Sequence, residues 1–149
     1  MNKLPLQIQI LTNLNCNLAC TYCYECKGRG QNDIKSIKEF ITARYEETEM
    51  HDSDREVIID FIGGESLMYP EMLDEICTYT TELHKKHHCT GTLTISLSTN
   101  GTLIAEDEKV QAFLLKWRPC VGFSVDGTKA IHDDCRIDTQ GNGSYDRAV

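Results

Sequence analysis

Alternation of short apolar segments with helical stretches constrains the fold of this chain more than any other feature. The four apolar segments are LQIQILT (6–12), REVIIDFIGG (55–64), TLTISLSTNG (92–101) and PCVGFSVDG (119–127). Apolar and β-branched residues that alternate or run together in this way predict strands. Strands that alternate with helices predict right-handed crossovers and a parallel sheet.

Between these segments, apolar residues recur at three- and four-residue intervals, as in an amphipathic helix. The first predicted helix begins at Ile34, with Asp33 as its N-cap. The second begins at Pro70, because proline is favoured in the first helical turn. The third covers 105–117, and a further helix is expected to start near Ser144.

The charge and the apolar content narrow the class of partner. The formal net charge is -8 and the basic residues are scattered, so we expect neither nucleic acid nor a membrane as a partner. The N-terminal apolar run is short and is interrupted by Gln7 and Gln9, which argues against a signal peptide. We therefore expect a cytoplasmic protein, where clustered cysteines are more often metal ligands or catalysts than disulfides.

The most distinctive residues follow the predicted strands. They form NLNCNLACTYCYEC (13–26), GGES (63–66), STNG (98–101) and VDGTKAIHDDCR (125–136). The C-terminal ends of parallel strands meet at one edge of a sheet, and ligand sites form there. We therefore expect these loops to share one site. The strand VIIDFI (57–62) is apolar almost throughout, which predicts that both of its faces are covered.

Cysteines in the first loop suggest a metal centre. Cys16, Cys20 and Cys23 form a C-x3-C-x2-C motif, and Cys26 follows it. Structural zinc usually uses two Cys/His pairs from separated segments, and the helix end at 84–89 offers one such alternative. Soft thiolates in one loop also suit an iron–sulfur cluster, and a cluster held by three cysteines leaves one iron open for a ligand.

This motif, with an aromatic residue before its last cysteine, resembles the signature of the radical S-adenosylmethionine (SAM) superfamily. The later loops agree in order. GGES resembles the GGE motif of that family, STNGTLI (98–104) resembles a common third-strand ending, and FSVDGTKAIHDDCR (123–136) resembles the S-x-D-G…H-D-x-x-R segment of its peptide- and protein-modifying branch. That branch includes the anaerobic sulfatase-maturating enzymes and other peptide maturases, which usually carry a C-terminal SPASM extension. Each motif alone is weak evidence for the family, but four of them in the same order at consecutive strand ends are strong evidence.

The resemblance implies an α/β fold, an incomplete (β/α) radical SAM partial barrel with about four parallel strands and their helices. The family core normally has more strands than this sequence supplies. We therefore expect residues 1–149 to form a single radical SAM core domain, the N-terminal portion of a chain truncated before the last strands and any SPASM extension. The exposed edge of the fourth strand would then favour self-association.

The resemblance also implies roles for individual residues. Cys16, Cys20 and Cys23 would bind three irons of a [4Fe-4S] cluster, and SAM would chelate the fourth. The expected SAM contacts are Tyr22, Gly63, Gly64, Glu65, Asn100, Ser124 and Arg136. Each of these also has a structural reading, such as a turn glycine or an ion-pair partner. No catalytic residue is assigned, although Asp126 is a candidate, and Cys26 is expected not to bind the cluster because a fourth thiolate would block the iron that binds SAM.

Taken together, these features indicate a radical SAM oxidoreductase or maturase, or a fragment of one. It would generate a 5′-deoxyadenosyl radical to modify a peptide or protein, with an electron donor such as flavodoxin or ferredoxin. The expected modification is oxidation of a Cys or Ser side chain, or formation of a thioether or carbon–carbon crosslink. The alternative is a non-catalytic remnant or a zinc-binding module of the same fold.

Overall fold

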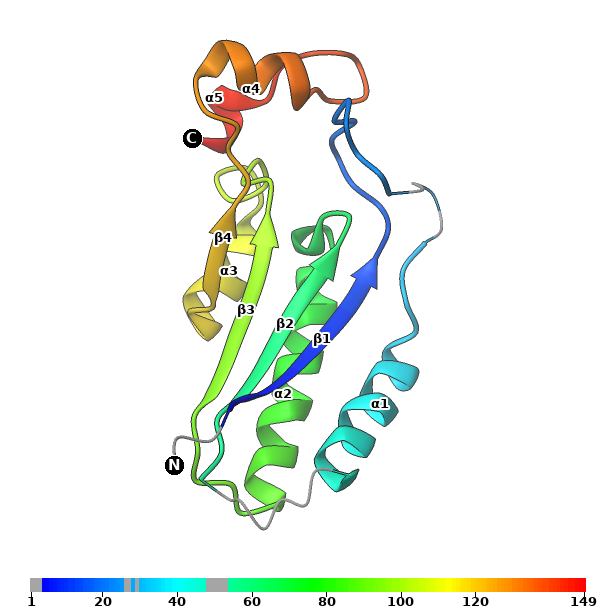
Figure 1. Ribbon diagram of the computed structural model, residues 1–149, viewed down its shortest axis with the longest axis vertical. Helices are drawn as coiled ribbons and strands as arrows, with labels where there is room; N and C mark the ends of the chain where they lie inside the picture. Colours follow the sequence, from blue (N-terminus) through cyan, green and yellow to red (C-terminus); the bar gives the residue numbers. More distant parts are fainter. Residues whose placement is uncertain (1–3, 26–27, 29, 48–53) are drawn as a thin grey trace.

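The described part of the chain folds around one parallel sheet. The computed structural model describes residues 4–25, 28, 30–47 and 54–149. Its strands are β1 (Leu6–Asn13), β2 (Val57–Gly63), β3 (Leu93–Thr99) and β4 (Cys120–Phe123), in the spatial order β1-β2-β3-β4. All neighbouring strands are parallel (Figure 1). The predicted parallel α/β fold is therefore confirmed.

Helices follow each strand. They are α1 (Ile34–Glu47), the short 3-10 helix η1 (Ser66–Met68), α2 (Pro70–Lys86), α3 (Glu108–Trp117), α4 (Lys129–Cys135) and α5 (Tyr145–Ala148). The predicted starts at Ile34 and Pro70 are confirmed. The third helix begins at Glu108 rather than at 105, because the carboxylate of Asp107 caps its first turn. None of the described helices is long and apolar enough to cross a membrane.

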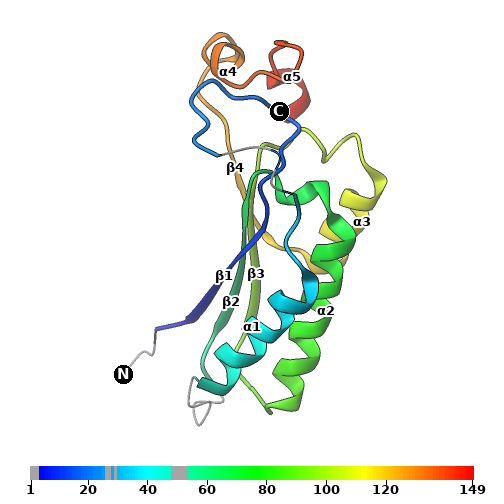
Figure 2. The same ribbon diagram turned by 90° about the vertical axis from the view of Figure 1, so that its right-hand side faces the viewer.

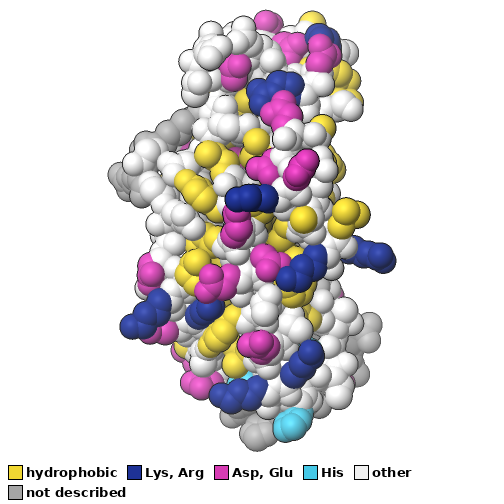
Figure 3. All heavy atoms as spheres, turned by 180° about the vertical axis from the view of Figure 1, so that it is seen from behind, with side chains coloured by type: hydrophobic (Ala, Val, Ile, Leu, Met, Phe, Trp, Pro, Cys, Tyr) yellow, Lys and Arg dark blue, Asp and Glu magenta, His cyan; other side chains and the backbone are white. Residues whose placement is uncertain are grey.

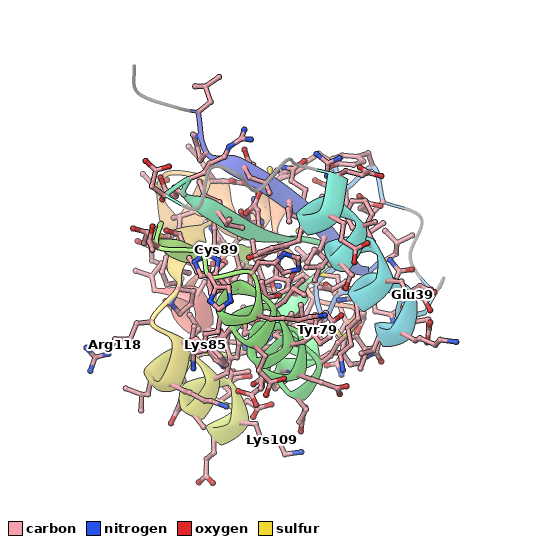
Figure 4. All side chains as sticks on the ribbon, turned by 90° about the horizontal axis from the view of Figure 1, so that it is seen from below. Glu39, Tyr79, Lys85, Cys89, Lys109 and Arg118 are labelled. Atoms are coloured by element: carbon pink, nitrogen blue, oxygen red, sulfur yellow. The ribbon has the colours of Figure 1, made fainter. Side chains whose placement is uncertain are left out.

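Three helices, α1, α2 and α3, lie on the same face of the sheet, with α2 between the other two (Figures 2 and 4). Because the strands follow one another in order, each right-handed crossover moves in the same direction and returns over the same face. The core fills the space between this face and the helices, with Ile8, Ile59 and Phe61 on the strands and Ile41 and Leu73 on the helices fully or almost fully buried.

Within the described residues, no helix covers the second face of the sheet, so the prediction that VIIDFI is covered on both faces is wrong. Val57, Ile59 and Phe61 are fully buried, whereas Ile62 is 36% exposed on the opposite face. The neighbouring Leu11 is 39% exposed. An apolar run therefore identified the strand correctly, but it did not distinguish the two faces.

Acidic and basic side chains are interspersed on the outer surface of the helices (Figure 3). Several of them pair between neighbouring helices. Lys38 on α1 contacts Glu75 on α2 at 2.7 Å, and Lys116 on α3 contacts Asp74 on α2 at 2.6 Å. Exposed pairs of this kind each contribute about 0.2–1 kcal/mol, so apolar burial supplies most of the stability of the helix layer.

The cysteine loop after β1 is held by the segment that follows α4. The backbone N–H of Ala19 donates to the carbonyl of Ile137 at 2.6 Å, and that of Thr21 donates to the carbonyl of Cys135 at 2.8 Å. Leu18 is fully buried beneath this contact. Residues 18–21 and 135–138, which are far apart in the sequence, thus lie side by side beyond the strand ends (Figure 1).

The two edges of the sheet differ. On the β1 edge, the N–H of Asn32 donates to Thr12 and the N–H of Leu14 donates to Gly30, so residues 30–32 cover the C-terminal end of the strand. On the β4 edge, Cys120 is exposed and Phe123 is 55% exposed. β4 is thus the strand at this edge of the described sheet.

Candidate functional site

A cavity of about 400 Å³ lies at the C-terminal edge of the sheet, where the loops after all strands meet. Every residue predicted to bind metal or cofactor lines it: Cys16, Cys20, Tyr22, Cys23, Gly63, Gly64, Glu65, Asn100, Ser124 and Arg136. The catalytic candidate Asp126 is not among the lining residues, although its carboxylate contacts two of them. Cys26 lies outside the described residues. The sequence prediction that the loops share one site therefore agrees with the structure.

Sequence reasoning missed the apolar part of the cavity. Leu11 and Ile62 line it from the C-terminal ends of β1 and β2, on the face opposite to the three helices. Tyr24, which is 91% exposed, and Ser98 also line it. Strand alternation placed Leu11 and Ile62 on the face opposite to the core, and this was the signal that could have identified them.

The sulfur of Cys16 accepts hydrogen bonds from the cysteine loop and from the end of β3. Its Sγ accepts from the backbone N–H of Leu18 at 3.4 Å and from Nδ2 of Asn100 at 3.8 Å. The N–H of Cys23 donates to the carbonyl of Cys20 at 3.1 Å, which closes a tight turn between these cysteines. Donors aimed at sulfur favour a thiolate and tune any metal that it binds.

The cysteines do not form a site for a single metal ion. Across residues 4–25, 28, 30–47 and 54–149, no three His, Cys, Asp or Glu side chains gather closely enough to hold one. In a [4Fe-4S] cluster each thiolate binds a different iron, and Cys16, Cys20 and Cys23 all line the same cavity. The donor set and its placement therefore fit a [4Fe-4S] cluster.

The alternative zinc pair at 84–89 lies at the opposite end of the sheet (Figures 1 and 4). Both ring nitrogens of His84 have protein partners there. Nδ1 lies 3.2 Å from the hydroxyl of Tyr45, and Nε2 lies 2.9 Å from the carbonyl of Gly91. His84 thus acts as a structural link between α1, α2 and the start of β3.

Both glycines of the GGES segment stand against the backbone of the cysteine loop. A Cβ on Gly63 would lie 2.2 Å from the carbonyl oxygen of Asn13, and one on Gly64 would lie 2.1 Å from that of Asn15. Gly63 also has a φ of +139°, which side chains disfavour. The N–H of Gly64 donates to Asn13 at 3.0 Å and that of Glu65 donates to Asn15 at 2.8 Å. Close packing of two loops therefore accounts for both glycines.

Glu65 links the ends of β2 and β3. Its side chain is almost fully buried. Oε1 accepts from the N–H of Leu67 at 3.1 Å and from the hydroxyl of Thr99 at 2.8 Å, and Oε2 accepts from the N–H of Asn100 at 2.8 Å. Burial raises the pKa of Glu65, and these hydrogen bonds oppose the rise. An ionised carboxylate has about four acceptor positions, so about one remains for a ligand.

Asn100 supports the cysteine loop. Its Oδ1 accepts from the N–H and the hydroxyl of Thr102, at 3.0 and 2.8 Å. Its Nδ2 donates to Asn17 at 2.9 Å, in addition to the contact with Cys16. The amide is thus used within the protein, and its predicted contact with a cofactor stays a prediction.

Tyr22, Asp126 and Arg136 form a charged cluster at the rim of the cavity. The hydroxyl of Tyr22 donates to Oδ2 of Asp126 at 2.5 Å, and Nε of Arg136 lies 3.0 Å from the same oxygen. The Arg136 N–H does not point at this oxygen, so the contact is an ion pair without hydrogen-bond geometry. The guanidinium also lies over the Tyr22 ring, 5.5 Å from its centroid. Burial raises the pKa of Tyr22 to about 12.

A parallel sheet with its helices on one face and its cavity at the C-terminal strand ends defines an α/β protein of the partial-barrel type. The Radical SAM superfamily matches residues 10–148, and the chain belongs to this family. The resemblance drawn from the sequence motifs is therefore confirmed.

Several relatives are anaerobic sulfatase-maturating enzymes. A cysteine-type enzyme of Clostridium novyi (strain NT) is 30% identical over 148 residues, which cover 91% of this chain and 36% of the relative. A serine-type enzyme of Bacteroides thetaiotaomicron is 30% identical over 135 residues, which cover 87% of this chain and 31% of the relative. The chain thus spans about a third of the length of these relatives.

Solved structures agree with this assignment. Native anSMEcpe with bound AdoMet and Cp18Cys peptide matches with a TM-score of 0.79 at 29% identity, over 97% of this chain and 38% of that one. Native anSMEcpe with bound AdoMet matches with a TM-score of 0.74, also at 29% identity, over 97% of this chain and 39% of that one.

Proposed function

We propose that this chain binds a [4Fe-4S] cluster through Cys16, Cys20 and Cys23 and binds SAM in the adjoining cavity. The observation that carries the proposal is that all predicted ligand residues, drawn from the loops after all of the strands, line one cavity. Its volume of about 400 Å³ lies within the range of roughly 300–1,000 Å³ that small-molecule sites occupy. The protein would be a radical SAM oxidoreductase or maturase.

When bound, the cluster and SAM would supply an electron and a 5′-deoxyadenosyl radical. The residues of the chain would hold SAM by its charged groups. Glu65 has about one acceptor position left, which suits the ammonium group, and the guanidinium of Arg136 suits the carboxylate. Leu11 and Ile62 would exclude water from the cavity next to the strand ends. Ser124 and Tyr22 stay proposed contacts.

We propose a peptide or protein as the substrate. Support comes from the relatives, which are sulfatase-maturating enzymes, and from a solved structure of anSMEcpe that contains a peptide. A donor such as flavodoxin or ferredoxin would reduce the cluster. The thiol ligands require a reducing compartment, which is why a cytoplasmic location is proposed.

Anaerobic reconstitution with iron and sulfide tests the cluster. We expect a brown protein with about four irons per chain that loses this iron in Cys20→Ala. Cys120→Ala is the matched control, because Cys120 is exposed at the start of β4, away from the cavity. Cys26→Ala is expected to keep the cluster. Zinc without iron in anaerobically purified protein, or full iron in Cys20→Ala, would refute the proposal.

Self-association through β4 is a separate proposal. Cys120 and Phe123 are exposed on the open edge of the sheet, and an unpaired strand edge is a template for pairing with a second chain. Light scattering is expected to show dimers or larger species. A monodisperse monomer at micromolar concentration would contradict it.

A further inference from the structure

Asp126 stands at the centre of the rim cluster without lining the cavity itself. Its Oδ2 receives the hydroxyl of Tyr22 at 2.5 Å and lies 3.0 Å from Nε of Arg136. Both of these partners line the cavity, one from the cysteine loop and the other from the end of α4. A single carboxylate oxygen therefore connects two neighbouring residues that line the site.

The contact with Arg136 leaves most of its guanidinium available. Asp126 approaches the guanidinium at Nε, and the Arg136 side chain is 14% exposed. The contacts described for this guanidinium are the ion pair of Nε with Asp126 and its position over the Tyr22 ring. A guanidinium has five N–H donors, and its terminal pair matches a carboxylate in a bidentate arrangement. The ion pair thus fixes one side of the group and leaves the other for an anionic ligand.

A second set of contacts holds the backbone on either side of this ion pair. The N–H of Asp126 donates to Nδ1 of His132 at 3.4 Å, and Nε2 of His132 lies 3.0 Å from the hydroxyl of Ser144. That hydroxyl donates to the carbonyl of Arg136 at 2.7 Å. His132 is fully buried and Ser144 is almost fully buried. This arrangement requires His132 to carry its proton on Nε2, and it ties the loop of Asp126 to the end of α4.

We propose that Asp126 is a positioning residue, which orients Arg136 toward the carboxylate of SAM and is itself held by the hydroxyl of Tyr22. The inference rests on the proposed function. It differs from the catalytic role considered for Asp126 from the sequence, because the carboxylate is directed at two protein side chains rather than at the cavity. Asp126 then affects the binding of the SAM carboxylate through Arg136 rather than by a direct contact.

Isothermal titration of the anaerobically reconstituted chain with SAM tests this role. Asp126→Ala is expected to weaken SAM binding about tenfold, the effect of one coupled contact, and to leave the iron content unchanged. Tyr22→Phe is expected to weaken it less. Asp134→Ala is the matched control, because Asp134 is an exposed aspartate on α4, and it is expected to bind SAM as the wild-type chain does.

Two further measurements separate positioning from general damage. Asp126→Ala is expected to leave the affinity for 5′-methylthioadenosine unchanged, because this compound lacks the amino-acid part of SAM. In an Arg136→Lys background, Asp126→Ala is expected to lower the SAM affinity less than twofold. Equal weakening of both ligands, or a fall in iron content together with SAM affinity, would overturn the positioning role.

The two proposals fail in different ways. A wild-type chain that binds iron but no SAM would refute the proposed function. A wild-type chain that binds SAM, with unchanged affinity in Asp126→Ala, would refute only the positioning role.

Discussion

Replacing Glu65 by Gln tests whether a buried carboxylate holds the ends of β2 and β3 together. The side chain accepts hydrogen bonds from the N–H of Leu67, the hydroxyl of Thr99 and the N–H of Asn100. Glutamine has nearly the same shape, but one of its two terminal atoms is a donor. With its oxygen placed toward Leu67 and Thr99, its NH₂ group faces the N–H of Asn100.

The magnitude follows from these contacts. Hydrogen bonds to a charged group are about 1 kcal/mol stronger than neutral ones, so the two that Glu65→Gln keeps weaken by about 2 kcal/mol together. The buried N–H of Asn100 loses its acceptor, which costs about 2 kcal/mol. Burying a charge is unfavourable, which is also why burial raises the pKa of Glu65. Removing this charge therefore offsets the loss of stability by about 2 kcal/mol. The expected net loss is about 2 kcal/mol.

Urea unfolding of the chain measures this loss. With a denaturant slope of about 2 kcal/mol/M, the midpoint is expected to fall by about 1 M. Glu75→Gln is the matched control: Glu75 pairs with Lys38 and its side chain is 51% exposed, so its loss is expected to stay below about 0.5 kcal/mol. A midpoint for Glu65→Gln that equals or exceeds that of the wild type would refute the reasoning.

Two other changes test the loop packing and the helix layer. Gly64→Ala places a Cβ 2.1 Å from the backbone oxygen of Asn15 and is expected to lower the unfolding free energy by about 3 kcal/mol in the same urea titration. Gly122→Ala is the control and is expected to be nearly neutral, because the nearest atom to its added Cβ is 3.4 Å away. For Asp74, burial raises the pKa but hydrogen bonds from a lysine and the tryptophan of α3 outweigh it, so the pKa is lowered from 3.8. The stability that ionised Asp74 contributes is present above about pH 4 and is lost as the pH falls through the lowered pKa. The unfolding free energies of Asp74→Asn and the wild type are therefore expected to converge at acid pH. A constant difference between them from pH 7 to pH 2 would contradict this.

The strands and long helices were predictable because their periodicity is local. The helix α4 was not, because KAIHDDC is only seven residues long and carries too few apolar residues to show a period. The fourth strand was expected to reach residue 127 but ends at Phe123. Beyond it, the N–H of Ser124 still donates to the carbonyl of Thr99, so the extended chain continues without regular pairing.

Gathering of the site residues was predictable, but several of their contacts were not. Parallel strand ends must meet at one edge, so motifs at these ends share a site whatever their chemistry. Which atoms then pair depends on how the loops fold over one another. Gly63 and Gly64 meet the cysteine loop, and Glu65 meets the end of β3, through contacts between residues far apart in the sequence. Spacing in the sequence carries no information about such contacts.

The open face of the sheet changes character along the strands, and this change indicates where the chemistry belongs. Near the start of β1 and in β2 the face is polar: Gln7 and Gln9 both donate to the carboxylate of Asp60, at 3.4 and 3.2 Å. Near the strand ends it becomes apolar, at Leu11 and Ile62, directly beside the cavity. A polar surface with its own hydrogen bonds does not require an apolar layer over it. Covering Leu11 and Ile62 would remove apolar surface from water and so lower the free energy. This face therefore favours a bound ligand beside the cysteine loop, whereas its polar half is suited to contact with water or with polar side chains.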